Sequence, residues 1–237
     1  MSSWRVHIGK VSPSRGDTYI YEFYQMVPEN ILLTLIATTV KSLTPDNFTR
    51  AFSAYEEAAL TLVEEVVETL IFGGGPVFLS QGAQVELDFC ARLRKATSLS
   101  VTTEFLSAVD ACHTLGIKRL GIISPFKEEL NSLVKSYFEE KGFQVPLIRG
   151  LGIERNIDIA NLPEDAAFNL TSEAFREGPA VDGYYITCPR WRTAASIATL
   201  EKETGRPVVT TVQSTIWSAF KALGIKDKIA GFGSLLS

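Results

Sequence analysis

The sequence predicts an α/β protein of two similar Rossmann-like halves, with parallel sheets related by a pseudo-two-fold axis and a cleft between them. Strand-like and helix-like segments alternate along all 237 residues, which favours mostly parallel sheets. Residues 102–117 align with residues 210–225, and six of the sixteen positions are identical. Four predicted strand ends precede a proline at matching separations of 112 and 113 residues, at Ser12-Pro13, Gly75-Pro76, Ser124-Pro125 and Cys188-Pro189. A duplicated α/β unit explains all of these regularities.

Strands are expected where β-branched and aromatic residues run between turn-forming residues, and helices where apolar residues recur every three or four positions. Leu60 and Val63 belong to such a helical stripe. The first part of the chain is therefore expected to form strands at residues 5–11, 31–38 and 70–72, with helices at residues 44–65 and from the glycine turn at 73–76 to about residue 95.

The second part continues the same alternation. Strands are expected at residues 99–102, 119–124, 183–187, 207–211 and 228–232, and residues 145–152 form a further short segment. Helices are expected at residues 104–115, 126–141, 163–176 and 214–223, and one more is expected to open at Pro189, because proline suits the first helical position. The predicted halves comprise residues 1–98 with 210–237, and residues 99–209.

Composition excludes several classes of protein. The chain is 46% hydrophobic and 21% charged, with a net charge of −4 and scattered basic residues, so we expect no nucleic-acid partner. No apolar run approaches the roughly 20 residues of a membrane span, and the first residues lack a signal-peptide pattern. Three widely spaced cysteines predict a reducing, cytoplasmic location, and two histidines without a Cys/His cluster predict no metal site. A homo-oligomer is compatible with this composition.

Cys188 is the strongest candidate for chemistry. It follows a predicted strand and would occupy the N-cap of the helix that opens at Pro189. Ligands of open α/β sheets bind at the carboxyl ends of strands, and a helix N-terminus favours a thiolate over a thiol. The alternative interpretation is a cysteine packed in the core, which is common for this residue. Cys90 and Cys112 lie among apolar helical neighbours and are expected to pack.

Other strand ends offer weaker candidates. The glycine run before Pro76 permits a ligand to approach the backbone closely, or forms only a tight turn. Ser12, Ser14 and Ser124 could bind a ligand or cap helices. Arg190 could attract a carboxylate or lie on a solvated surface. If the halves face each other, all of these residues border one cleft.

These features resemble the aspartate/glutamate racemase superfamily, and within it the branch of the arylmalonate decarboxylases and maleate isomerases. The best stretches are residues 150–153, residues 174–183 leading to Thr187-Cys188, and residues 205–210. Racemases and maleate isomerases of this superfamily carry a cysteine in each half. The decarboxylases keep only the cysteine of the second half and have a glycine at the equivalent position of the first half. The first position falls here on Gly74 or Gly75, so the pattern resembles the decarboxylases.

The resemblance implies a mechanism without a cofactor. A carbon that bears two carboxylates loses CO₂, and the Cys188 thiol protonates one face of the resulting enediolate. In the decarboxylases, hydroxyl groups and a backbone N–H hold the enediolate charge, but this chain offers Gly75, Pro76, Phe126 and Pro189 at those positions. The residues that could replace these hydrogen-bond donors are Ser14, Ser124, Thr187 or Arg190.

The expected substrate is therefore a small carboxylic acid. The residues expected to bind it are Ser12, Pro13, Ser14, Gly74, Gly75, Pro76, Ser124, Phe126, Thr187, Pro189 and Arg190. Two alternatives remain open at this point. One is a racemase or maleate isomerase-like enzyme that pairs Cys188 with a non-cysteine partner, and the other is a carboxylate-binding protein without catalysis.

Overall fold

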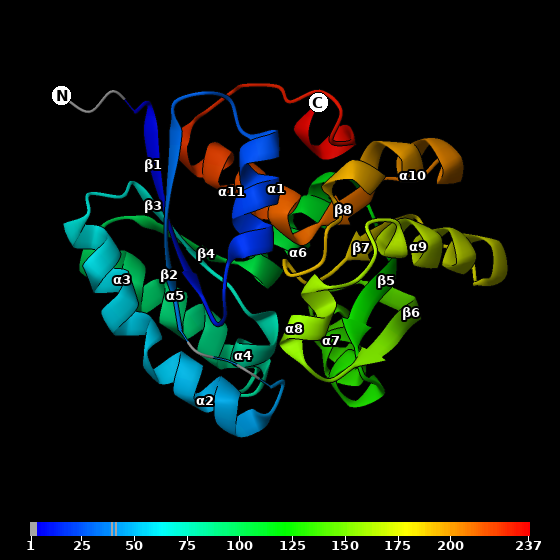
Figure 1. Cartoon of the computed structure of the whole chain (residues 1–237), viewed down its shortest axis with the longest axis horizontal. Helices are drawn as coiled ribbons and strands as arrows, with labels where there is room; N and C mark the ends of the chain where they lie inside the picture. The colour runs from blue at the N-terminus through cyan, green and yellow to red at the C-terminus, as the bar shows by residue number, and fades with distance from the viewer. Residues whose placement is uncertain (1–3, 39, 41) are drawn as a thin grey trace.

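Two four-stranded parallel sheets form the framework of the molecule, as a computed structural model describes it for residues 4–38, 40 and 42–237 (Figure 1). The strand orders are β2-β1-β3-β4 and β6-β5-β7-β8, so the two sheets have the same connectivity. The strands are β1 (Val6–Ser12), β2 (Ile31–Ala37), β3 (Thr69–Phe72), β4 (Ser100–Thr103), β5 (Arg119–Phe126), β6 (Gln144–Ile153), β7 (Gly183–Ile186) and β8 (Val208–Thr210). The predicted α/β class with parallel sheets is confirmed.

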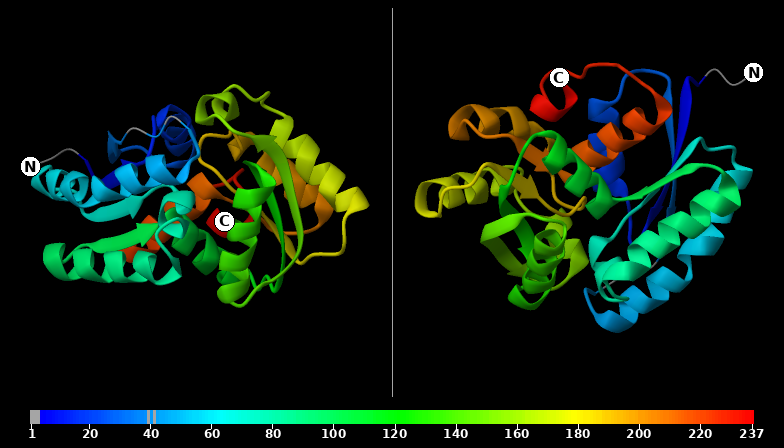
Figure 2. Two further views of the ribbon diagram at one scale, coloured as in Figure 1. Left: turned by 90° about the horizontal axis from the view of Figure 1, so that it is seen from below. Right: turned by 180° about the vertical axis from the view of Figure 1, so that it is seen from behind.

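Helices connect the strands and cover both sheets (Figure 2). They are α1 (Asp17–Met26), α2 (Pro45–Ser53), α3 (Tyr55–Glu64), α4 (Gly75–Leu79), α5 (Ala83–Thr97), α6 (Glu104–Thr114), α7 (Glu128–Glu140), α8 (Asn156–Ala160), α9 (Ala166–Glu177), α10 (Ile197–Thr204) and α11 (Thr211–Leu223), with short 3₁₀ turns η1 (Ala194–Ser196) and η2 (Ser234–Leu236). None of the described helices is long and apolar enough to span a membrane.

The repeated sequence segments become α6 and α11, which pack against each other in the middle of the molecule (Figure 1). Thr103 ends β4 and caps α6, because its hydroxyl accepts the Leu106 N–H at 3.0 Å. The apolar core runs without interruption through the second sheet and these two helices, and a second cluster lies under α2, α3 and α5 of the first half. The strand ends of both sheets are thereby held at fixed positions around the centre.

Several predicted boundaries need correction. The helix expected at 44–65 is divided at Ala54, whose N–H bonds to the Ala51 carbonyl in a tight i→i−3 turn. The helix expected to reach residue 95 is divided before Ala83 by Gly82, which adopts a φ of +105°. Residues 100–103, which the sequence assigned to the second half, pair with β3 in the first sheet. The first sheet therefore extends past the expected boundary at residue 98.

Two predicted elements are absent from the described chain. Residues 228–232 form no strand and instead follow an irregular path, which the Ile229 N–H to Leu236 carbonyl bond of 2.7 Å closes. No helix opens at Pro189, because residues 189 and 190 form a turn and regular helix resumes only at η1 and α10. Helices α1, α8 and α10 were not expected at their positions.

Candidate active site

A cavity of about 50 Å³ lies where the strand ends of the two halves meet. The loop after β1, the start of α4 after β3, the start of α6 after β4, the end of β5 and the loop after β7 all contribute to its wall. The residues that line it are Ser12, Pro13, Ser14, Arg15, Gly16, Tyr19, Val40, Leu43, Phe48, Gly74, Gly75, Pro76, Val77, Glu104, Phe105, Phe126, Asn156, Thr187, Cys188, Pro189 and Arg190. Carboxyl ends of parallel strands are the usual position for a ligand in such folds.

The cavity brings together most of the residues that the sequence singled out. They are Ser12, Pro13, Ser14, Gly74, Gly75, Pro76, Phe126, Thr187, Cys188, Pro189 and Arg190. Ser124 is the exception, because its fully buried hydroxyl accepts the Phe126 N–H at 2.9 Å and donates to Asn131 Oδ1 at 2.5 Å. These bonds brace the turn at the end of β5, so Ser124 contributes to the backbone of the site and not to its surface.

Cys188 lies two residues beyond the end of β7, in a left-handed conformation with a φ of +87°. Its N–H donates to Thr211 Oγ1 at 3.0 Å, and its carbonyl accepts the Trp191 N–H at 3.3 Å. The predicted N-cap position is therefore wrong, since the chain makes a tight turn at this point and no helix follows directly. Left-handed backbone is uncommon for residues other than glycine and is concentrated at functional sites.

The Cys188 thiol is protonated at neutral pH. Burial is the main cause, and it raises the thiol pKa to about 12, while the N–H groups of Arg190 and Trp191 oppose this change and the charge of Glu104 adds to it. The expectation of a thiolate assumed the dipole of a following helix, and this helix is absent from the turn at 189–190. A buried, protonated thiol is suited to donate a proton rather than to attack as a nucleophile.

Gly74 is the counterpart of Cys188 in the first half. It lies two residues beyond β3 with a φ of +78°, and its N–H donates to Glu104 Oε2 at 2.7 Å. Glu104 is the first residue of α6, as Thr211 is the first residue of α11. The sequence left Gly74 and Gly75 as alternatives, and the structure favours Gly74, because Gly74 and Cys188 both lie two residues after their strands with a left-handed φ.

No side chain fits at Gly74 without movement of its neighbours. A Cβ atom at this position would lie 2.7 Å from Pro13 Cγ and 2.9 Å from Val77 Cγ2. Its left-handed φ would strain any other residue as well. The cavity wall is therefore main chain at Gly74 and Gly75, while Pro76 and Val77 of the same segment also line it.

A buried ion pair, which the sequence analysis missed, supports the Gly74 loop. Lys10 Nζ lies 2.8 Å from Glu104 Oε1 and 4.0 Å from the centre of the Tyr19 ring. Burial lowers the Lys10 pKa, and the Glu104 charge opposes this effect. Lysine is almost never fully buried without a partner, so Lys10 within an apolar strand was the available signal in the sequence.

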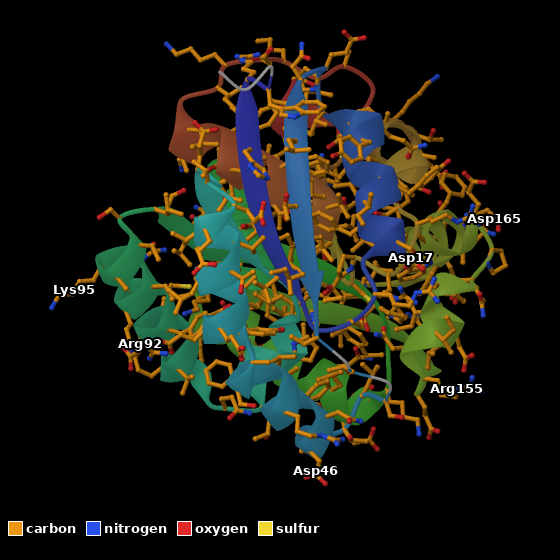
Figure 3. All side chains as sticks on the ribbon, turned by 60° about the vertical axis from the view of Figure 1, so that its left-hand side comes forward. Asp17, Asp46, Arg92, Lys95, Arg155 and Asp165 are labelled. Carbon is orange, nitrogen blue, oxygen red and sulfur yellow. The ribbon has the colours of Figure 1, made fainter. Side chains whose placement is uncertain are left out.

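Arg190 is nearly buried at the wall of the cavity, with 7% of its side chain exposed. Its Nη1 donates to the Arg15 carbonyl at 2.7 Å and to the carboxylate of Asp17, which lies at the start of α1 (Figure 3). Its Nε is buried and has no hydrogen-bond partner among the described residues. The alternative of a solvated surface position for Arg190 is therefore excluded.

Glu22 on α1 fixes the segment that follows Cys188. Its buried carboxylate accepts the N–H groups of Thr193 and of Ala194, the latter at 2.7 Å. Burial raises the Glu22 pKa to about 7, and these hydrogen bonds oppose the change. The carboxylate serves as the N-terminal cap for η1, although it comes from an element 171 residues earlier.

Fold and site together define the class. Two parallel α/β halves that meet at a cavity with one cysteine place the chain in the aspartate/glutamate racemase superfamily, in the branch of arylmalonate decarboxylases and maleate isomerases. The chain belongs to the arylmalonate decarboxylase family, whose model matches residues 10–236.

The chain is similar both to maleate isomerases and to an arylmalonate decarboxylase. Maleate isomerase from Pseudomonas putida KT2440 is 27% identical over an alignment of 248 positions, and the alignment covers 97% of this chain and 96% of that protein. Arylmalonate decarboxylase from Bordetella bronchiseptica is 23% identical over 195 residues, or 82% of this chain and 81% of that protein. The crystal structure of a maleate isomerase from Pseudomonas putida S16 superimposes with a TM-score of 0.90 at 23% identity, over 98% of both chains.

Proposed function

We propose that this protein is a cofactor-independent, arylmalonate decarboxylase-like enzyme that acts at the α-carbon of a small carboxylic acid, with Cys188 as the proton donor. One observation carries the proposal. The buried thiol of Cys188, with a pKa raised to about 12, lines the cavity at the strand end that corresponds to the bare Gly74. The cavity thus offers an acid from one half and no matching cysteine from the other.

The proposed reaction has two steps. The bond between the α-carbon and one carboxylate breaks, CO₂ leaves, and the bonding electron pair becomes part of an enediolate. Cys188 then transfers the proton of its thiol to the α-carbon, and the thiolate regains a proton from water. The backbone N–H groups of Arg190 and Trp191, which lower the pKa of the Cys188 thiol, stabilise the transient negative charge on its sulfur.

Handedness of the product follows from the asymmetry between the two strand ends. The loop at Gly74 presents main chain and carries no proton-donating side chain at the position equivalent to Cys188. A planar enediolate between the two loops would be protonated only from the side of the thiol. A prochiral malonate is therefore expected to give one enantiomer.

The experiment that tests this proposal measures CO₂ release and product handedness with methyl(phenyl)malonate. Replacement of Cys188 by Ala should lower kcat by roughly 100- to 10,000-fold, the usual contribution of a positioned general acid. Cys112→Ala is the matched control, because Cys112 is also fully buried but lies in α6 and not at the cavity. Turnover by Cys188→Ala at nearly the rate of the unsubstituted protein would refute the assignment.

A second candidate is a cis-trans isomerase or racemase that pairs Cys188 with a non-cysteine group. The 27% identity to a maleate isomerase over nearly the whole chain favours it. Measurement of CO₂ distinguishes the isomerase or racemase from the decarboxylase. Isomerisation of maleate gives fumarate without CO₂, and racemisation in D₂O brings deuterium into the recovered substrate without CO₂. A third outcome, binding of carboxylates without turnover of malonates or maleate, would support the non-catalytic alternative.

A further inference from the structure

The segment that leads from Cys188 to η1 has no helix or strand that would fix its path. Cys188 adopts a left-handed φ of +87°, and Thr193, the N-cap of η1, makes no side-chain hydrogen bond to the N–H groups that follow it. The buried ring of Trp191 draws the segment towards the core, but the burial of apolar surface has no direction. The path of this segment therefore needs hydrogen bonds from other elements.

Helix α1 provides such hydrogen bonds at two points. The Glu22 carboxylate accepts the N–H groups of Thr193 and Ala194, the latter at 2.7 Å. Its second oxygen accepts the Thr193 hydroxyl at 3.3 Å. Asp17, at the start of the same helix, accepts a hydrogen bond from Nη1 of Arg190. Because α1 connects β1 to β2, the first half of the molecule holds the segment that carries the cysteine of the second half.

Helix α11 holds the other end of the segment. Thr211 Oγ1 accepts the Cys188 N–H at 3.0 Å. Thr215 Oγ1, one turn further along α11, lies 2.9 Å from the Tyr19 hydroxyl of α1, so the two helices are bonded to each other (Figure 1). Cys188 thus lies between two linked supports, one at its own N–H and one at the start of η1. A proton donor acts only within hydrogen-bond reach of the atom that it protonates, so this support bears directly on its chemistry.

The second half offers an internal comparison for Glu22. Helix α7 corresponds to α1, because it connects β5 to β6 as α1 connects β1 to β2. The separation of 112 residues between the two strand ends places Val134 at the position of Glu22, and both side chains are buried. The loop after Gly74 needs no such cap, because α4 begins at Gly75. A buried carboxylate costs free energy, and this one lies beside the segment with the cysteine and not beside its counterpart.

We propose that Glu22 is a positioning residue for Cys188, because it fixes the segment after the cysteine and so keeps the thiol at the wall of the cavity. The use of this thiol as a proton donor rests on the proposed function, whereas the effect of Glu22 on the segment does not depend on turnover. Removal of the carboxylate leaves two buried N–H groups without an acceptor. The segment should then open locally, while the helices that carry Cys90 and Cys112 stay closed.

Alkylation of the three buried cysteines reports this local opening. At pH 8, Glu22→Leu should raise the rate at which iodoacetamide labels Cys188 by roughly 10- to 100-fold, as expected for the loss of hydrogen bonds to a charged group. Cys90 on α5 and Cys112 on α6 should change by less than about 3-fold, since their own helices keep their hydrogen bonds. Peptide mass spectrometry measures the three rates in one sample. An unchanged rate at Cys188, or an equal rise at all three cysteines, would overturn the proposal.

Two variants control for the loss of charge and for the loss of stability. Glu22→Gln keeps an oxygen for the two N–H groups, which both bond to Oε1, so its Cys188 should be labelled within about 3-fold of the rate in the unsubstituted protein. Glu86→Leu removes another buried carboxylate, whose partners Thr103 and Tyr137 lie outside the cysteine segment. It should not expose Cys188 preferentially. Preferential labelling of Cys188 in Glu86→Leu, or the full effect in Glu22→Gln, would contradict the positioning role.

Two further measurements separate the proposal from failure to fold and from the proposed reaction. In the unsubstituted protein, amide hydrogen exchange at Thr193 and Ala194 should be as slow as in the interior of α10, and rapid exchange at both would refute the bonds to Glu22. With a malonate that is turned over, Glu22→Leu should lower kcat by roughly 10- to 100-fold and change KM little. An unchanged kcat would contradict the positioning role. Absence of turnover in the unsubstituted protein would reject the proposed function, and the labelling rates would still decide on Glu22.

Discussion

Lys10 and Glu104 form an ion pair of 2.8 Å with almost no exposure to solvent, 0% and 3% for the two side chains. The pair joins the central strand β1 to the first turn of α6, and through the Gly74 N–H it also fixes the loop opposite Cys188. A buried ion pair does not by itself imply a gain in stability, because both charges lose their hydration. Its clearest effect is the cost of removing one partner.

Lys10→Met leaves the Glu104 carboxylate buried without its counter-charge. We expect the free energy of unfolding to fall by about 3–5 kcal/mol in urea titrations, whereas the double variant Lys10→Met with Glu104→Met should recover most of this loss. Arg92 and Glu56 form an equally short but exposed pair, which makes Arg92→Met a suitable control with an expected loss of at most about 1 kcal/mol (Figure 3). Equal losses for Lys10→Met and Arg92→Met would show that burial is not decisive.

Glu22 makes stability depend on pH. Its folded-state pKa of about 7 lies above the ordinary value of 4.5, so the folded protein binds more protons than the unfolded chain between these values. The stabilisation of the folded protein by the extra proton on Glu22 is fully present below pH 4.5 and is lost as the pH rises through 7. The free energy of unfolding changes by about 3 kcal/mol across this range. Glu22→Gln should flatten the curve of unfolding free energy against pH in this window, as urea titrations at several pH values would show. A slope that the substitution leaves unchanged would refute this assignment.

The sequence predicted the alternating architecture because periodicity is a local property. Strands such as β1 and β7 were found to within about one residue, since β-branched and aromatic runs mark them. Helix α1 was missed because its N-cap is Gly16 without a side-chain hydrogen bond, and its aromatic residues are also typical of strands. A local pattern of aromatic residues therefore does not show whether such a segment forms a strand or a helix.

Errors at the site arose where distant contacts decide the conformation. Pro189 and the residues after it favour a helix locally, but the cap for this segment comes from Glu22, far earlier in the chain. The left-handed turn at Cys188 depends on Thr211 in the same way. Lys10 and Glu104 are 94 residues apart, so neither reveals its partner by spacing. Cys188 could be chosen because it follows a predicted strand and precedes a proline, which are local features, whereas the sequence left Gly74 and Gly75 as alternatives because the internal repeat pointed to Gly75.

Gly74 is expected to tolerate no side chain. Gly74→Ala should lower the free energy of unfolding by about 2–4 kcal/mol, from the left-handed φ together with contacts to Pro13 and Val77 below 3 Å. Gly116→Ala is the matched control, because Gly116 has a similar φ of +71° but open space around its Cβ position. It should lose only the backbone part, about 1 kcal/mol. Equal losses in thermal or urea unfolding would mean that the contacts at Gly74 are relieved without cost.

Cys188 should react slowly with alkylating reagents in the native protein. With a thiol pKa of about 12, only about one thiol in 10,000 is ionised at pH 8, on the order of 1000-fold less than for a free cysteine. Cys90 and Cys112 are buried with raised thiol pKa values as well, so native labelling by iodoacetamide should be slow at all three positions. Peptide mass spectrometry after timed labelling, with urea-unfolded protein as the control, measures each site. Rapid modification of Cys188 near neutral pH would instead identify a thiolate and favour a nucleophile over a proton donor.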